Sequence, residues 1–329
     1  MHILVTGACG FLGRKLIETL LARGQLLGPT GEAAPVSRIV ATDILPQPAG
    51  LPADERVSYQ AGDISDPEFV ALLFAENPWS VFHLAALVSG GAEQDFDAGM
   101  KANLTGTIHL LEAARRTGVC PRFVFTSSIA AYGGDLPEVV SDEHHLTPES
   151  SYGVQKAIGE LLVNDYTRKG FVNGRSFRLP IIAIRPGGAN TAASSWASAI
   201  IREPFSGVDY ACPVAPEDRG FLLSPLKAIE GLIVGHDAPD EAWGRNRSVM
   251  MAGLSCTARE LVDALARVAG ARVAERVRWQ PDPFVRGIIT TWPTRFSLHK
   301  ARRIGLEADA SIDDIVAQYI RDYSVLAPA

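Results

Sequence analysis

The sequence has few cysteines and no long apolar run. Its four cysteines, Cys9, Cys120, Cys212 and Cys256, lie far apart and form no C-x-x-C pair. This spacing argues against a zinc ribbon and against a disulfide framework. No stretch approaches the ~18 uninterrupted apolar residues of a membrane span, and the beginning of the chain lacks the basic segment of a signal peptide. We therefore expect a cytoplasmic protein that works in a reducing setting.

Basic residues are also scarce relative to acidic ones. The 329 residues include 31 Lys and Arg against 37 Asp and Glu, for a formal net charge of -6, and show no basic run. Nucleic acids and anionic membranes attract proteins through clustered lysines and arginines. The composition therefore predicts neither a nucleic-acid nor a membrane partner.

Metal-ligating side chains show no convincing spacing. His144 and His145 lie beside Asp142 and Glu143. Adjacent histidines rarely ligate one ion together. A solvated loop is the simpler interpretation, and we expect no metal site.

Apolar runs and helical spacings alternate along the first part of the chain. Continuous apolar strands between amphipathic helices predict a parallel sheet covered on both faces, which is a doubly wound α/β fold. The predicted strands are 3–6, 38–42, 80–84, 122–126 and 179–185, and the predicted helices are 11–23, 67–75, 103–117 and 151–169.

The pattern loosens after Pro186, which predicts a domain of residues 1–186 and a smaller lobe of residues 187–329. A strand near 247–252 is expected to rejoin the first sheet. Thr257 and Glu260 have capping-box spacing at the start of a predicted helix, 258–269. Ser311 is placed to cap a last helix, 312–323.

Three glycines follow the first predicted strand and open the first helix. They are Gly7, Gly10 and Gly13, with Phe11 and Leu12 between the last two. Bare backbone lets a pyrophosphate approach, and the free N–H groups at the helix N-terminus stabilise its charge. This position between strand and helix favours dinucleotide binding by residues 1–186 over an ordinary strand–helix turn.

Acidic residues end the next two strands. Asp43 is placed to accept hydrogen bonds from the adenosine ribose, and its charge would repel a 2'-phosphate, which favours NAD over NADP. Asp63 and Ile64 are expected at the adenine. A plain Asx turn at Asp63 is an open alternative.

A tyrosine and a lysine stand four residues apart in the predicted helix 151–169. Tyr152 and Lys156 share a helix face, where the ammonium favours the phenolate of a tyrosine whose ordinary pKa is about 10. Exposed pairs of this kind are also common. Ser127 and Ser128, however, end a predicted strand at the sheet edge where such folds bind ligands. The group therefore points to proton transfer on a carbonyl or alcohol.

Together these motifs resemble those of the extended short-chain dehydrogenases and nucleotide-sugar epimerases. The shared residues are Gly7-x-x-Gly10-x-x-Gly13, His83-Leu84-Ala85-Ala86, Asn103, Ser128 and Tyr152-x-x-x-Lys156. The resemblance implies an NAD-dependent oxidoreductase in which Ser128 orients the substrate oxygen and Tyr152 exchanges its proton. Lys156 would tune Tyr152 and bind the nicotinamide ribose.

The resemblance also implies further cofactor contacts and a partner. The expected contacts are Leu84, Ala85, Ala86, Asn103 and Pro186. Relatives commonly form a homodimer by pairing the helices that correspond to 103–117 and 151–169.

The segment 185–204 is similar to a loop of one subgroup of this family, whose members oxidise the C2 hydroxyl of the sugar acid D-erythronate to 2-oxo-tetronate. The resemblance implies the same reaction here. Small hydroxyl residues and an arginine suit a polyhydroxy acid, since a guanidinium binds a carboxylate. The expected substrate contacts are Ser89, Ser128, Asn190, Ser194, Ser195 and Arg202. Open alternatives are helix capping by the two adjacent serines and pairing of Arg202 with Glu203 or Glu217.

Two other functions remain open. A nucleotide-sugar epimerase or dehydratase would use the same catalytic residues but needs basic residues for a diphosphate, and Arg219, Arg245 and Arg247 are candidates. A non-catalytic NAD-binding sensor is the second, although the intact Tyr152 and Lys156 argue against it.

Overall fold

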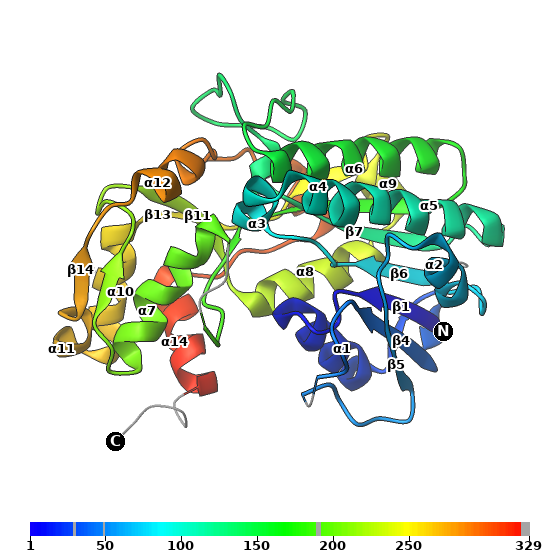
Figure 1. Ribbon diagram of the computed structural model, residues 1–329, viewed down its shortest axis with the longest axis horizontal. Coiled ribbons are helices and arrows are strands. Elements are labelled where there is room, and N and C mark those ends of the chain that lie inside the picture. Colours follow the sequence, from blue (N-terminus) through cyan, green and yellow to red (C-terminus); the bar gives the residue numbers. More distant parts are fainter. Residues whose placement is uncertain (29–30, 49, 189–191, 324–329) are drawn as a thin grey trace.

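The computed structural model describes residues 1–28, 31–48, 50–188 and 192–323. A central sheet of seven parallel strands has the order β12-β8-β7-β6-β1-β4-β5 (Figure 1). Its strands are β1 His2–Thr6, β4 Arg38–Asp43, β5 Val57–Ala61, β6 Ser80–His83, β7 Arg122–Ser128, β8 Asn173–Leu179 and β12 Ser248–Met250. The predicted doubly wound α/β fold is confirmed.

Helices cover both faces of this sheet. Side chains alternate along a strand, so Leu4 faces one layer while Ile3 and Val5 face the other. The layer over Leu4 consists of α2 Pro67–Leu73, α5 Gly106–Thr117 and α6 Ser151–Arg168, and the opposite layer includes α1 Phe11–Arg23 and α8 Pro225–Asp237 (Figure 1). Helices thus bury both faces of the sheet, and only the ends of the strands remain accessible to a ligand.

The strand predicted at 179–185 was wrong. The sheet strand is β8, and β9 Ile181–Ile182 pairs instead with β11 Arg219–Leu223 outside the central sheet. Two buried arginines, Arg175 and Arg178, interrupt the apolar pattern of β8, and each is compensated by an ion pair, with Asp240 and Glu160 respectively. Burial of a paired charge leaves no signal in hydrophobic periodicity.

The α-helix predicted at 103–117 begins at Gly106 in the structure and ends at Thr117 as predicted. A π-helical turn, η1 Met100–Thr105, leads into α5. Short helices and a hairpin complete the sheet domain, and they are β2 Gln25–Leu27, β3 Ala33–Pro35, α3 Ser89–Gln94, α4 Phe96–Gly99, η2 Ile129–Ala131, α9 Asp240–Trp243 and α13 His299–Ile304.

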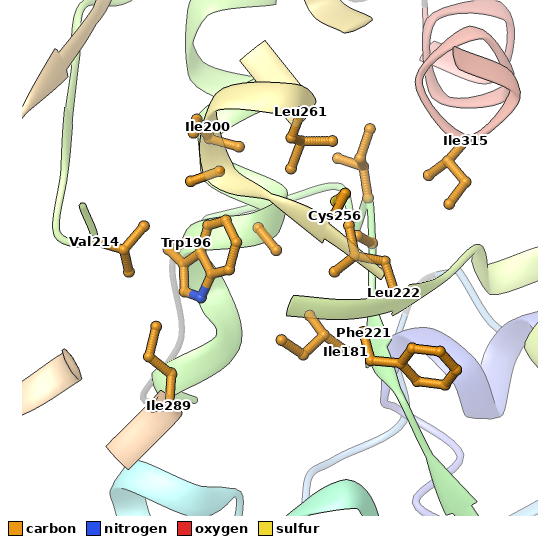
Figure 2. Packing of buried hydrophobic residues seen from close by; sticks show 14 of the residues in the cluster. Ile181, Trp196, Ile200, Val214, Phe221, Leu222, Cys256, Leu261, Ile289 and Ile315 are labelled. Atoms are coloured by element: carbon orange, nitrogen blue, oxygen red, sulfur yellow. The ribbon is translucent and has the colours of Figure 1, made fainter. Parts of the chain in front are cut away.

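A second lobe forms beside the carboxyl edge of the sheet (Figure 1). It contains η3 Ala193–Ser195, α7 Trp196–Phe205, β10 Tyr210–Cys212, β13 Leu254–Thr257, α10 Ala258–Ala269, α11 Ala271–Ala274, β14 Val277–Trp279, α12 Pro283–Ile289 and α14 Ile312–Tyr323. Its core joins Trp196 and Ile200 of α7 to Leu261 of α10 and Ile315 of α14 (Figure 2).

The predicted helix 258–269 is confirmed together with its capping box. The Glu260 amide donates to Thr257 Oγ1 at 3.0 Å, and the Thr257 amide donates to Glu260 Oε2 at 2.6 Å. This rigid start orients α10 against α7 and α14. Within the described ranges, no helix has the length and apolar character needed to cross a membrane.

Candidate active site

A cavity of about 720 Å³ lies at the carboxyl ends of the parallel strands. Loops at this edge of a doubly wound sheet diverge around a crevice, which is where ligands of such folds bind. The second lobe contributes part of the wall, including Trp292. The predicted site residues on the wall are Gly7, Gly10, Phe11, Leu12, Gly13, Asp43, Asp63, Ile64, Leu84, Ala85, Ala86, Ser89, Ser128, Tyr152, Lys156, Ser194 and Ser195.

The glycine cradle, residues 7–13, packs so closely against its own backbone and the loop after β6 that two of its positions have no room for a side chain. Gly7 has φ +71°, and a Cβ on it would meet the Ala85 amide nitrogen at 2.7 Å. A Cβ on Gly13 would meet the Gly7 carbonyl oxygen at 2.2 Å. No side chain caps the start of α1. Residues 10–12 line the cavity, so the free N–H groups at the start of α1 lie at its wall, where they suit a pyrophosphate.

Asp43 is the last residue of β4, and its carboxylate is hydrogen-bonded to the glycine cradle. Its Oδ2 accepts from the Cys9 amide at 3.0 Å and its Oδ1 from the Leu45 amide at 3.2 Å. These bonds fix the carboxylate on the cavity wall, as the assignment to the adenosine ribose requires.

Asp63 makes the Asx turn that the sequence left open. Its Oδ1 accepts from the Ser65 amide at 2.9 Å and from Ser65 Oγ at 2.7 Å, and its Oδ2 lies 3.0 Å from Lys101 Nζ. These contacts together lower the pKa of Asp63 although burial opposes them. Lys101 also lines the cavity. Sequence reasoning missed this lysine, whose only signal was its place before Asn103.

Ser128, Tyr152 and Lys156 meet where β7 ends beside α6. Ser150 caps α6 by accepting from the Gly153 amide at 3.2 Å, which fixes the first turn that carries Tyr152. The Lys156 ammonium nitrogen lies 5.6 Å from the centre of the Tyr152 ring. The three side chains thus converge on one part of the cavity, as predicted from their spacing.

Burial sets the protonation of this group. It raises the pKa of Tyr152 to about 12, against which the hydrogen bond with Ser128 acts. It lowers the pKa of Lys156 to about 7, against which the charge of Glu160 acts. Burial therefore drives the two pKa values apart from their ordinary values of 10.0 and 10.5. Neighbouring titratable groups whose pKa values are pushed apart are typical of proton-transfer sites.

The Ser127 hydroxyl is hydrogen-bonded to the buried ion pair of Glu160 and Arg178. Its Oγ donates to Glu160 Oε1 at 2.5 Å, and Glu160 Oε2 accepts from Arg178 Nη2 at 2.7 Å. Ser127 is therefore engaged in packing β7 against α6 and β8. The preference for Ser128 as the hydroxyl next to Tyr152 agrees with this arrangement.

Asn103 does not line the cavity. Its Oδ1 accepts from the Leu87 amide at 2.8 Å, and its Nδ2 donates to the Leu87 carbonyl at 2.9 Å and to Gln155 Oε1 at 2.7 Å. The expected cofactor contact is corrected accordingly, since these bonds use the amide to tie the loop after β6 to α6. Pro186 is also absent from the wall, where its neighbour Arg185 stands instead.

The expected substrate contact of Arg202 is not what the structure shows. Its Nε and Nη2 donate to Glu203 Oε1 at 2.9 and 2.6 Å, and its Nη1 donates to the Arg185 carbonyl at 3.0 Å. Arg202 does not line the cavity, whereas Arg185 does. Pairing with Glu203, the first alternative, is thus the one observed. Asn190 lies outside the described residues.

The two adjacent serines do not act as side-chain caps. Ser195 precedes α7 without a capping hydrogen bond to that helix, and Ser194 lies in the short η3 turn. Both line the cavity. Trp292 lines the cavity from the second lobe. No sequence pattern predicted it there, because it follows the short helix α12 and no motif surrounds it.

The loop of His144 and His145 gathers no ligand set. Asp142, next to these histidines, is buried and its Oδ1 accepts from the Met250 amide at 2.6 Å. Across the described ranges, no three His, Cys, Asp or Glu side chains form a group that could hold a metal ion.

A doubly wound sheet with a glycine cradle, an aspartate at the end of β4 and a serine, tyrosine and lysine at one strand edge defines an oxidoreductase of the extended short-chain type. The chain belongs to the NAD-dependent epimerase/dehydratase family, whose sequence profile matches residues 3–197, and NAD is its cofactor.

Similar proteins extend this relationship over the whole chain. It is 49% identical to D-erythronate dehydrogenase from Cupriavidus necator over 98% of each chain. It is 37% identical to D-erythronate dehydrogenase from Haemophilus influenzae over 97% of this chain and 99% of that protein. A crystal structure described as a nucleoside-diphosphate-sugar epimerase from Agrobacterium tumefaciens superposes with a TM-score of 0.91 at 40% identity, covering 99% of this chain and 95% of that one.

Proposed function

We propose that this protein oxidises the C2 hydroxyl of D-erythronate with NAD and releases 2-oxo-tetronate and NADH. The observation that carries the proposal is the near full-length similarity to two D-erythronate dehydrogenases. The wall of the cavity supports it, because the family's Ser128, Tyr152 and Lys156 are all present and meet at one strand edge.

The glycine cradle and two acidic turns would hold the cofactor. The pyrophosphate would lie on the N-terminus of α1 above Gly7 and Gly13, and the adenosine ribose would bind Asp43. When bound, NAD supplies the hydride acceptor. Ile64 would pack at the adenine, with the Asp63–Lys101 ion pair at its edge.

Tyr152 would remove the hydroxyl proton as the hydride leaves C2. Ser128 would hold the reacting oxygen through its hydroxyl, and Lys156 would stabilise the phenolate and bind the nicotinamide ribose. One C–H bond and one O–H bond break, a carbonyl forms, and the proton leaves through Tyr152. Proton transfer by a positioned side chain typically accelerates such reactions by roughly 10²–10⁴-fold.

The residues considered for a diphosphate do not lie at this cavity. Arg219 pairs with Glu260 at 3.8 Å and Arg247 with Asp240 at 3.4 Å. Neither these two nor Arg245 is among the described residues on the wall. The arrangement supports a sugar-acid dehydrogenase over a nucleotide-sugar epimerase.

A substrate screen tests the proposal. Four- to six-carbon aldonates and nucleotide sugars are offered with NAD, and NADH absorbance is followed. We expect net NADH with D-erythronate. Epimerisation of a nucleotide sugar without net NADH would contradict the proposal. NADH formation with the nucleotide sugars but with none of the aldonates would also contradict it.

We also propose a cytoplasmic homodimer. Val154 and Leu161 lie seven residues apart on one face of α6 and are 42% and 67% exposed, and Phe96 of α4 is 58% exposed. Residues seven apart form one stripe of a helix, and an exposed apolar stripe suits pairing with its own copy. Light scattering on the purified protein, with Leu161→Arg as the disrupting variant, measures the oligomeric state.

A further inference from the structure

Two arginines lie close together after β8, and the structure separates their roles. Arg202 is 5% exposed and is neutralised by Glu203. Arg185 forms no ion pair with a described residue, and the sequence has no Asp or Glu at 29–30, 49, 189–191 or 324–329. Among the described residues, Arg185 is thus a cation on the cavity wall without a carboxylate partner.

The backbone of Arg185 is held from both sides. Its amide donates to Ser198 Oγ at 3.0 Å, and its carbonyl accepts from Arg202 Nη1 at 3.0 Å. Its Nη2 donates to the Gly188 carbonyl at 2.9 Å. The fixed main chain and the bond from Nη2 to Gly188 together restrain the guanidinium, which lowers the entropy cost of binding an anion.

The distribution of charge in the cavity follows from the strand order. The acidic residues on the described wall are Asp43 and Asp63, which follow β4 and β5 at one end of the sheet. Ser128 and Arg185 follow β7 and β8 toward the other end, with Ser128 in register with Leu179. The end of the crevice that holds Tyr152 and Lys156 therefore carries positive charge and hydroxyls but no carboxylate.

Partial burial and the neighbouring Arg202 lower the pKa of Arg185, so its cationic form is less favourable than in water. A bound carboxylate would relieve this cost, because an opposite charge stabilises a partly desolvated guanidinium. Ser89, Ser194 and Ser195 on the same wall can bind hydroxyls.

We infer that Arg185 binds the carboxylate of the substrate and makes the enzyme selective for 2-hydroxy acids over neutral sugars. This inference rests on the proposed dehydrogenase function. With the carboxylate held, the adjacent C2 hydroxyl is placed toward Ser128 and Tyr152. Arg185 thus takes the role that the sequence assigned to Arg202.

Paired substrates test this role. D-erythronate and its uncharged amide are compared as substrates of the wild type, Arg185→Gln and Arg185→Lys. Loss of a charge-assisted contact to Arg185 should raise the KM for D-erythronate about 10- to 100-fold in Arg185→Gln. The amide should be oxidised equally by wild type and Arg185→Gln, and Arg185→Lys should recover part of the preference for the acid.

Two measurements distinguish binding from folding. NADH binding, followed by its fluorescence, should be unchanged in Arg185→Gln. The matched control Arg267→Gln removes a surface arginine that pairs with Asp313 in the second lobe, and it should retain wild-type kinetics. A wild-type KM for D-erythronate in Arg185→Gln, or an equal loss for acid and amide, would overturn the inference.

The proposed function and the inference fail in different ways. A wild type that is inactive with D-erythronate refutes the former, and Arg185 is then tested on the hydroxy acid that the screen identifies and on its amide. A wild type that oxidises only neutral sugars overturns the inference itself.

Discussion

Lys156 places its ammonium nitrogen 5.6 Å from the centre of the Tyr152 ring, one turn further along α6. Neither group has its ordinary proton affinity there, since burial raises the pKa of the phenol and lowers that of the amine. Burial thus destabilises the phenolate of Tyr152 and the ammonium of Lys156, which are the charged forms that the proposed mechanism uses.

Tyr152→Phe should lower kcat for D-erythronate by about 10²–10⁴-fold, because it removes the proton acceptor and leaves the cavity wall in place. Binding of NAD should stay within about twofold of the wild type, measured by fluorescence titration with NADH. The control is Tyr166→Phe, a tyrosine near the other end of α6 whose hydroxyl donates to Glu112. It should keep wild-type turnover, and equal losses in the two variants would refute the assignment.

Lys156→Met should change how stability depends on pH. The folded-state pKa of Lys156 is about 7, against an ordinary value of 10.5. Between these values only the unfolded state binds the proton, so the wild type should gain stability as pH rises and should be most penalised below pH 7. Lys156→Met lacks this term. The difference in Tm between variant and wild type should therefore be largest near neutral pH and shrink toward alkaline pH.

Lys169→Met provides the comparison for that experiment. Lys169 follows α6 and is exposed, so its ammonium stays hydrated in the folded protein. The Tm of Lys169→Met should differ from that of the wild type by the same amount at every pH. A pH-independent offset for Lys156→Met would show that the amine is not destabilised by burial.

Asp43→Asn should relax the preference for NAD. The amide keeps an oxygen for the Cys9 or Leu45 amide but loses the charge that repels a 2'-phosphate. We expect the ratio of kcat/KM for NAD over NADP to fall about tenfold or more, a change of about 1.4 kcal/mol. A wild type that prefers NADP would be incompatible with the role of Asp43.

Gly13→Ala should weaken both NAD binding and the fold. Its Cβ would meet the Gly7 carbonyl oxygen at 2.2 Å, which forces the turn to open. Overpacking of this kind costs about 1–3 kcal/mol of unfolding free energy. Gly287→Ala in α12 is the control, since a Cβ there meets nothing within 4 Å. It should be neutral or stabilise by up to about 1 kcal/mol in chemical denaturation.

Sequence patterns sufficed where function depends on local spacing. The sequence predicted Gly7, Gly13 and Asp43 at the cofactor and Tyr152 and Lys156 at the reacting group, and all five line the same cavity. Each is set by its own strand or helix, whose period and ends the sequence encodes directly.

Hydrophobic periodicity failed where charges are buried in pairs. Arg175 and Arg178 made β8 look unlike a central strand, and their partners Asp240 and Glu160 lie 65 and 18 residues away. Nothing in a local window predicts such a pair, so the strand was placed on the apolar residues that follow it.

The sequence by itself determined the NAD-binding class of this chain and predicted that a serine, a tyrosine and a lysine lie at one site, because these features stand at strand ends and on one helix face. Only the tertiary structure decided which arginine lines the cavity. The sequence pointed to Arg202 and did not single out Arg185, but Glu203 neutralises Arg202, and the packing of α7 against the segment after β8 leaves Arg185 on the cavity wall. That choice depends on contacts across the fold, which spacing along the chain does not encode.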